Sequence, residues 1–176
     1  MGLRYSFELT WNATDGMKAL RALSARLVDH GHQAQVHWAD AQVSLYCFSR
    51  DPITLGPGNG CGLLVSIWLP EDPAHRNLIA TYEKRLRTGP ETFPDMEVAI
   101  GFVELDISIG HRFCRLSFKA TTSDMSRYFE CSPHVSRWFL EFGHRTGGLE
   151  ILFDDETDDA FVDLNGGARR IPRSLG

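Results

Sequence analysis

The stretch EVAIGFVELDISIGHRFCRLSFKAT, residues 97–121, decides the fold, because it is the longest uninterrupted β pattern in the chain. Apolar and polar residues alternate on both sides of Gly110-His111, a pair that suits a two-residue hairpin turn with glycine in its first central position. This turn would place Asp106 opposite Arg115, with apolar pairs on the other face. The stretch is therefore predicted to be a long hairpin with one apolar face and one charged face.

The alternation breaks down at the start of this hairpin. Val98, Ile100 and Phe102 fall on the face that carries the acidic residues further along the strand. A β-bulge at Gly101 would explain the change, and so would a strand end that is covered on both faces. The sequence leaves both explanations open.

The rest of the 176-residue chain predicts a single α+β domain, residues 1–172, followed by a loose tail, residues 173–176. Further strands are predicted at 3–11, 33–38, 42–48, 63–69 and 149–153, the fourth of them apolar enough to be central. Three helices are predicted, from Asp15 to His30, from Pro73 onward and from Pro133 onward. The expected architecture is a mostly antiparallel sheet with three helices packed on it.

The predicted elements follow the order strand–helix–strand–strand twice. Ser6-Phe7 and Thr10 recur at the same spacing as Ser117-Phe118 and Thr121, each time before a helix. An internal duplication, with the hairpin at 97–121 joining the halves, is a hypothesis that superposition of the halves would test.

Charge is concentrated near the C-terminus. Residues 150–163 contain seven acids and no Lys or Arg, so that the net charge of −5 becomes +2 without them. No basic stripe of the kind that binds nucleic acid is present. The segment made by Asp154, Asp155, Glu156, Asp158 and Asp159 is predicted to bind another protein, with a basic surface as the natural complement. A weakly held divalent cation or a solvated turn would also explain this segment.

The sequence indicates a cytoplasmic protein. It has no secretory signal and no apolar run near the roughly 20 residues that cross a membrane. Its four cysteines form no CxxC pair, which is typical of free thiols in a reducing compartment. No membrane association is therefore expected, and the oligomeric state is left open.

Two sets of residues are candidates for chemistry. His30, His32 and His37 lie close enough in sequence to hold zinc or nickel, although the first two flank Gly31, where a helix was expected to end. Cys61 lies in the glycine-rich segment 51–62 and is the candidate reactive thiol. The glycine spacing fits neither a dinucleotide fingerprint nor a Walker loop, so no cofactor is implied.

Glu104 and Asp106 are two carboxylates on one strand face, which is an arrangement that can support acid–base catalysis. Ion pairs with Arg115 and Lys119 explain them more simply, and no catalytic residue is assigned. The sequence therefore favours a non-enzymatic protein that binds a macromolecule, comparable by analogy to an immunity or inhibitor protein. The alternatives are a small-molecule-binding protein or enzyme with a pocket between helices and sheet, and a weak divalent-metal binder.

Overall fold

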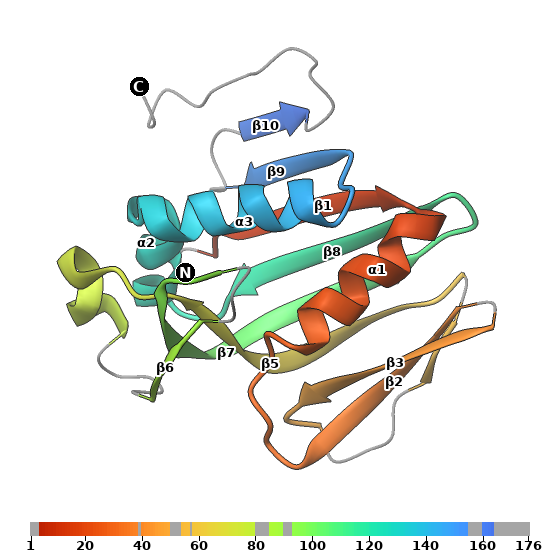
Figure 1. Cartoon of the computed structure of the whole chain (residues 1–176), viewed down its shortest axis with the longest axis horizontal. Coiled ribbons are helices and arrows are strands. Elements are labelled where there is room, and N and C mark those ends of the chain that lie inside the picture. The colour runs from red at the N-terminus through yellow and green to blue at the C-terminus, as the bar shows by residue number, and fades with distance from the viewer. Residues whose placement is uncertain are drawn as a thin grey trace.

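The computed structural model describes residues 4–38, 40–49, 54–56, 58–79, 85–89, 93–154 and 160–163. The strands are β1 (Ser6–Asn12), β2 (His32–Trp38), β3 (Ala41–Cys47), β4 (Thr54–Leu55), β5 (Gly60–Pro70), β6 (Leu86–Thr88), β7 (Met96–Ile109), β8 (Phe113–Ala120), β9 (Glu150–Asp154) and β10 (Ala160–Asp163). The helices are α1 (Ala13–Ser24), the 3₁₀ helix η1 (Pro73–Ile79), α2 (Ser123–Cys131) and α3 (Pro133–Arg145) (Figure 1).

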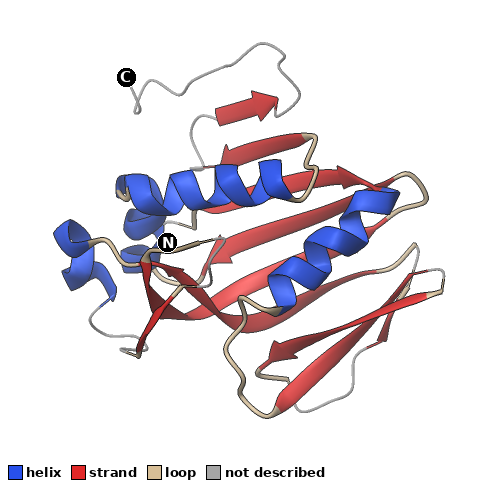
Figure 2. Ribbon diagram, viewed as in Figure 1, coloured by secondary structure: helices blue, strands red, loops and turns tan. Residues whose placement is uncertain are grey.

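The main sheet has seven strands in the order β10-β9-β1-β8-β7-β5, with β6 paired to β7 as well. All of its pairings are antiparallel, whereas the second sheet, β3-β2-β4, contains one parallel pair. Helices α1, α2 and α3 lie on one face of the main sheet, and the second sheet packs against α1 (Figure 2). The predicted α+β fold with a mostly antiparallel sheet is confirmed, and the second sheet was not foreseen.

Aromatic side chains fill the space between the main sheet and its helices. Phe7 of β1 stacks on Phe139 of α3 with ring centroids 4.2 Å apart, and Trp138 stacks on Phe142 one turn along α3. All four of these residues are buried. The apolar faces predicted for the first strand and the last helix therefore form the core.

The described residues contain four helices, so the prediction of three is wrong. The additional helix is α2, whose first turn is capped by Thr122 and which buries Tyr128 and Phe129. The sequence there is mostly polar, and a helix of nine residues offers only two turns of periodicity.

Helix α1 ends at Ser24, six residues before the predicted end at His30. The chain from Arg26 to Val28 continues as an extended segment along the edge of β5: Trp68 N–H donates to Arg26 O (2.8 Å), and Val28 N–H donates to Ser66 O (2.9 Å). Strand β5 is thus at the end of the main sheet and not central as expected. Its apolar sequence is explained by this covering segment, which contributes the buried Leu27.

The hairpin β7–β8 has the predicted faces and a different register. Arg115 lies opposite Ser108, and not opposite Asp106, which pairs with Ser117. The turn residues are His111 and Arg112 instead of Gly110-His111. The start of α1 holds this turn, because Ala13 N–H donates to Arg112 O at 2.9 Å. A shift of two residues keeps every side chain on its face, which is why the pattern alone did not distinguish the two registers.

Of the two explanations that the sequence left open for the start of the hairpin, the structure shows the β-bulge at Gly101. Gly101 and Phe102 together oppose Ser66, so that the register between β5 and β7 shifts there by one residue. Phe102 has a φ of 58°, in the left-handed region that bulky residues rarely occupy.

Two sequence predictions find no test in the fold. The tail at 173–176 lies outside the described residues. In the proposed halves, β2 and β3 belong to the second sheet whereas β9 and β10 belong to the main sheet, and the duplication stays a prediction.

No helix in the described part of the chain is long and apolar enough to cross a membrane.

Candidate functional site

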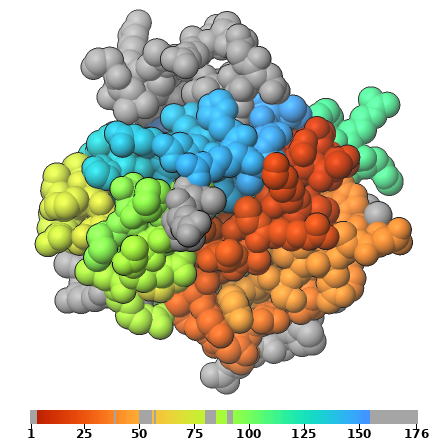
Figure 3. Space-filling view, viewed as in Figure 1, coloured from red at the N-terminus to blue at the C-terminus, as the bar shows by residue number. Residues whose placement is uncertain are grey.

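The face of the main sheet that points away from α1, α2 and α3 is called the outer face here. Opposite residues on paired antiparallel strands share a face, and the pairings place the outward residues in three rows. These rows are Glu150–Thr10–Arg115–Ser108, Leu152–Glu8–Ser117–Asp106–Gly62 and Asp154–Ser6–Lys119–Glu104–Leu64. Figure 3 shows the opposite side of the molecule, where helices and the second sheet form the surface.

The three rows carry five acidic and two basic side chains, which is a net charge of −3 on this face. The alternation of the strands explains this, because one residue in two along β1, β7, β8 and β9 points outward. Two of the five acids, Glu150 and Asp154, belong to the acidic stretch at residues 150–163, and the other three, Glu8, Glu104 and Asp106, come from β1 and β7.

Lys119 lies in the middle of these acids. Its ammonium group forms an ion pair with Asp106, and this hydrogen bond, followed by the charges of Asp106, Glu104 and Glu8, raises the pKa of Lys119 against the opposing effect of burial. The single lysine thus stays charged and offsets only part of the negative field. Asp106 and Lys119 are each about one-third exposed, so water screens the pair and it adds little to stability.

A cavity of about 450 Å³ opens on the outer face at the turn of the hairpin. Its lining includes Thr10, Ser108, Phe113, Arg115 and Glu150. Its lining side chains lie on the outer face, whereas a second cavity of about 450 Å³ lies between α1 and the second sheet, beside Met17, Trp38 and Ala41. The cavity between α3 and the sheet, beside Phe93 and Glu97, measures about 20 Å³, which is room for about one water molecule.

An aromatic patch, defined by His30, Phe48, Leu64 and Phe102, lies at the β5 end of the third row. The rings of His30 and Phe48 stack with centroids 3.9 Å apart, and those of Phe48 and Phe102 with centroids 4.9 Å apart. Phe48 N–H donates to Leu64 O at 2.9 Å, which fixes Phe48 at the edge of β5. The left-handed backbone of Phe102 costs about 1–3 kcal/mol.

Of the residues predicted to bind a partner, only Asp154 is described, as the last residue of β9 and the first of the third row. Asp155, Glu156, Asp158 and Asp159 lie outside the described residues. The described strands before and after this segment, β9 and β10, pair with one another at one end of the main sheet.

The three histidines are not brought together as ligands. His32 and His37 are both on β2, five positions apart, so they point to opposite faces of that strand. His30 lies outside the strand and stacks on Phe48. Among the described residues no group of three or more His, Cys, Asp or Glu side chains has the arrangement of a metal site.

Cys61 is part of β5, opposite Ile107, and not part of a glycine-rich loop. Burial, followed by the charge of Asp106 and the neighbouring Cys47, raises the pKa of the Cys61 thiol. A raised pKa disfavours the thiolate, which is the nucleophilic form. The environment of Cys61 thus opposes the role of a reactive thiol.

Glu104 and Asp106 lie on the outer face as predicted, with different partners. Glu104 is directly opposite Lys119, and Lys119 pairs diagonally with Asp106. Arg115 is two residues away from its predicted partner, opposite Ser108. The two carboxylates belong to an exposed charged surface and not to an enclosed acid–base pair.

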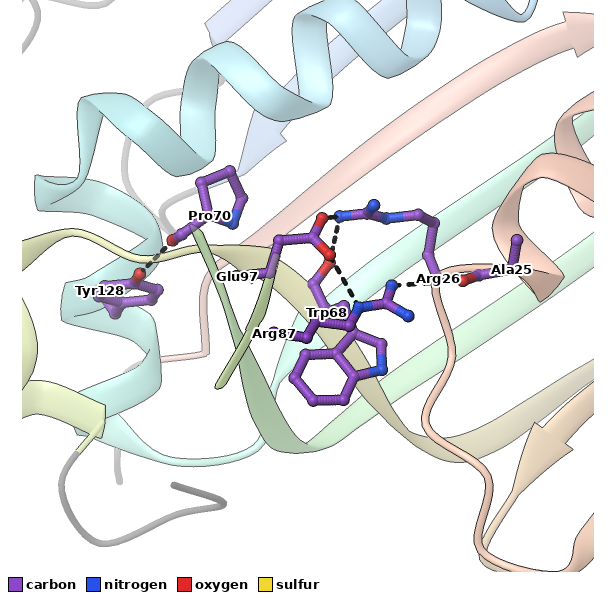
Figure 4. Close-up of polar contacts among 7 residues, drawn as sticks. All are labelled: Ala25, Arg26, Trp68, Pro70, Arg87, Glu97 and Tyr128. Atoms are coloured by element: carbon purple, nitrogen blue, oxygen red, sulfur yellow. Dashed lines mark hydrogen bonds and ion pairs between the residues drawn. The ribbon is translucent and has the colours of Figure 1, made fainter. Parts of the chain in front are cut away.

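A buried ion network was not foreseen from the sequence (Figure 4). Arg26 and Glu97 form an ion pair while exposing 2% and 1% of their side chains, and Arg87 Nε donates to the second oxygen of Glu97 at 2.8 Å. Burial, with a smaller effect of Arg87, lowers the pKa of Arg26 to about 9, so it remains charged at neutral pH. Its guanidinium lies over the rings of Phe93 and Trp138.

A second buried cluster joins η1 to the start of α3. The buried carboxylate of Asp72 accepts hydrogen bonds from Ser132 Oγ (2.8 Å), His75 Nδ1 (2.9 Å) and Ala74 N (3.0 Å). Ser132 donates to Asp72 and not to His75, so this is not the order of a nucleophile, base and orienting acid. Asp72 and Ser132 were both recognisable as helix caps, but their contact across 60 residues had no sequence signature.

Comparisons of the chain with protein-family models, curated proteins and solved structures found no match.

Proposed function

We propose that this protein binds a basic protein partner through an acidic docking surface, formed by the outer face of the main sheet and the adjoining segment 154–159. The observation that carries the proposal is the charge of the three outward rows, −3 over five neighbouring strands. Fields of this kind steer a partner of opposite charge and raise its association rate. The function is binding without catalysis.

A sheet suits this role because its outward residues form a broad and nearly flat surface. A standard protein interface buries about 800 Å² on each partner, which needs many contributing residues. The rows span β9, β1, β8, β7 and β5, so neighbouring positions are about 4.8 Å apart across the strands. Ser6, Thr10 and Ser117 lie between the charged residues and are buried, so the longer charged side chains form the layer that a partner would contact.

Affinity capture from a lysate of the native host, at low and at high ionic strength, tests this function. We expect the unaltered chain to retain a basic protein at low ionic strength and to release it at high ionic strength. Charge reversal by Glu104→Lys and Asp106→Lys together should abolish this capture, because it converts the centre of the docking surface to positive charge.

The matched control reverses the same number of charges away from the outer face, with Asp40→Lys and Glu130→Lys. Asp40 lies in the turn between β2 and β3, and Glu130 lies on α2. This control should retain the partner. Equal recovery with both double variants, at equal thermal stability, would refute the docking surface.

A further inference from the structure

The aromatic patch contains large apolar side chains that remain exposed, and one of them has an unfavourable backbone conformation. Phe102 is 46% exposed and Leu64 is 39% exposed, although both are large and apolar. Phe102 also has the positive φ that only glycine, asparagine and aspartate adopt readily. A bulge at this position would form at lower cost with one of those residues, so the side chain of Phe102 is placed on the surface at the expense of stability.

The surroundings hold Phe102 in one orientation. Its carbonyl oxygen accepts a hydrogen bond from Thr121 Oγ1, and its ring stacks on Phe48. Ser66, the residue of β5 that lies opposite the bulge, is only 1% exposed. The ring is thus preorganised and lies beside the acidic rows, which reduces the entropy lost when a partner binds.

The patch adjoins a carboxylate. Glu104 is two residues after Phe102 on β7 and directly opposite Leu64 on β5. Lys119 lies directly opposite Glu104 and forms its described ion pair with Asp106, and the charge of Glu104 contributes to the raised pKa of Lys119. An aromatic ring beside a carboxylate binds a guanidinium group well, because the planar cation stacks on the ring while its N–H groups reach the acid.

We propose that the aromatic patch is the energetic centre of the docking surface and receives an arginine side chain of the basic partner, stacked on Phe102 and ion-paired with Glu104. This inference rests on the proposed function, because the acidic rows bring the basic partner to the face. Arginine and aromatic residues dominate the few positions that carry most binding energy at interfaces. The acidic rows then attract the basic partner, and the aromatic patch favours arginine over lysine in that partner.

Two peptides of equal length, oligoarginine and oligolysine, provide the test, with affinity measured by titration calorimetry at low ionic strength. The unaltered chain should bind oligoarginine more tightly. Phe102→Asn should weaken oligoarginine binding about three- to tenfold and leave oligolysine binding unchanged, because only the ring is lost. The same substitution should raise Tm by a few degrees, since asparagine tolerates the left-handed backbone.

Two further variants complete the design. Phe102→Leu keeps an apolar side chain without the flat ring and should show the same selective loss. Met96→Asn changes another exposed apolar residue of β7, 50% exposed and far from the patch, and should alter neither affinity.

The possible failures are distinguishable. If both peptides bind, and Glu104→Lys with Asp106→Lys weakens both, the docking surface stands. Unchanged oligoarginine affinity in both Phe102 variants would then overturn the arginine site alone. If neither peptide binds, or if the charge reversal has no effect, both proposals fail together.

Discussion

Glu97 forms ion pairs with two arginines from inside the protein. Its carboxylate contacts Arg26, which is almost fully buried, and Arg87, which is 35% exposed. Burying a charge is tolerated only when an opposite charge accompanies it, so the stability of this region depends on one acidic side chain.

We predict that Glu97→Gln lowers the free energy of unfolding by about 3–5 kcal/mol, because Arg26 is left buried beside the like charge of Arg87. Urea denaturation measures the change. Replacing the buried pair together, by Arg26→Met and Glu97→Leu, should cost less than the single change. Arg87→Ala is the matched control, because it removes the partly exposed partner of Glu97. A loss of stability as large as that of Glu97→Gln would contradict this account.

Asp72 gives the protein a dependence on acid. Burial alone would raise the pKa of Asp72, and the hydrogen bonds from His75, Ser132 and Ala74, together with the charge of His75, outweigh it and hold the pKa below its ordinary value. A carboxyl with a depressed pKa contributes stability above its unfolded-state pKa of about 4 and loses that contribution as the pH falls through the folded-state pKa.

Unfolding free energy measured against pH should therefore fall below about pH 4, in part because Asp72 becomes protonated. We predict that Asp72→Asn flattens this acid limb and lowers stability at neutral pH by about 1–3 kcal/mol, since charged hydrogen bonds are lost. Ser132→Ala should lower stability without removing the acid limb. An unchanged pH profile in Asp72→Asn would show that other carboxylates control acid unfolding.

The two buried clusters could not be predicted from the sequence, because their members lie far apart along the chain. Arg26 and Glu97 are 71 positions apart, and their charges have the appearance of ordinary surface residues in the sequence. By contrast, Glu104 and Asp106 were placed together on one strand face, because strand alternation is a local property.

Among the elements, α1 is fixed by a close approach to β8. A Cβ atom on Gly16 would lie 2.5 Å from Cys114 Cβ and 3.3 Å from Trp38 Cζ3, so glycine is required where the helix crosses the strand. The sequence shows this glycine inside a helical pattern, where it lowers helix propensity, without showing the strand that explains it.

Gly16→Ala should destabilise the protein by about 1–3 kcal/mol through this overlap, although alanine favours an isolated helix by about 1 kcal/mol. Thermal and urea unfolding measure the sum of the two effects. Arg21→Ala on the exposed side of the same helix is the control and should change stability little. A gain of stability in Gly16→Ala would mean that α1 can move away from β8.

The sequence predicted an element well where its local pattern was strong. The hairpin faces were predictable, because alternation is local, and the interruption at Gly101 was visible although its cause was left open. The hairpin register was not, since the contact of Ala13 with the turn selects it. The proposed duplication matches Phe7 with Phe118, and these two residues are cross-strand partners. Superposition of the two halves remains its test.

At the scale of the whole molecule, the sequence predicted the sheet and the acidic character but not the order of the strands. Strand β9 lies beside β1, far away in sequence, and this pairing brings Asp154 next to the outer face. The aromatic patch likewise combines β5, β7 and two connecting segments. Which strands and segments lie side by side depends on the topology of the fold, and no local sequence pattern encodes it.

The segment from Arg26 to Val28, which runs along β5, also bears on how the molecule avoids self-association. Strand β5 contains LLVSIWL, an uncharged apolar run of the kind that templates intermolecular sheets when its edge is open. The chain's own backbone occupies that edge with hydrogen bonds on either side of Ile67. The segment from Arg26 to Val28 therefore covers an edge of β5 that could otherwise pair with a strand of another chain.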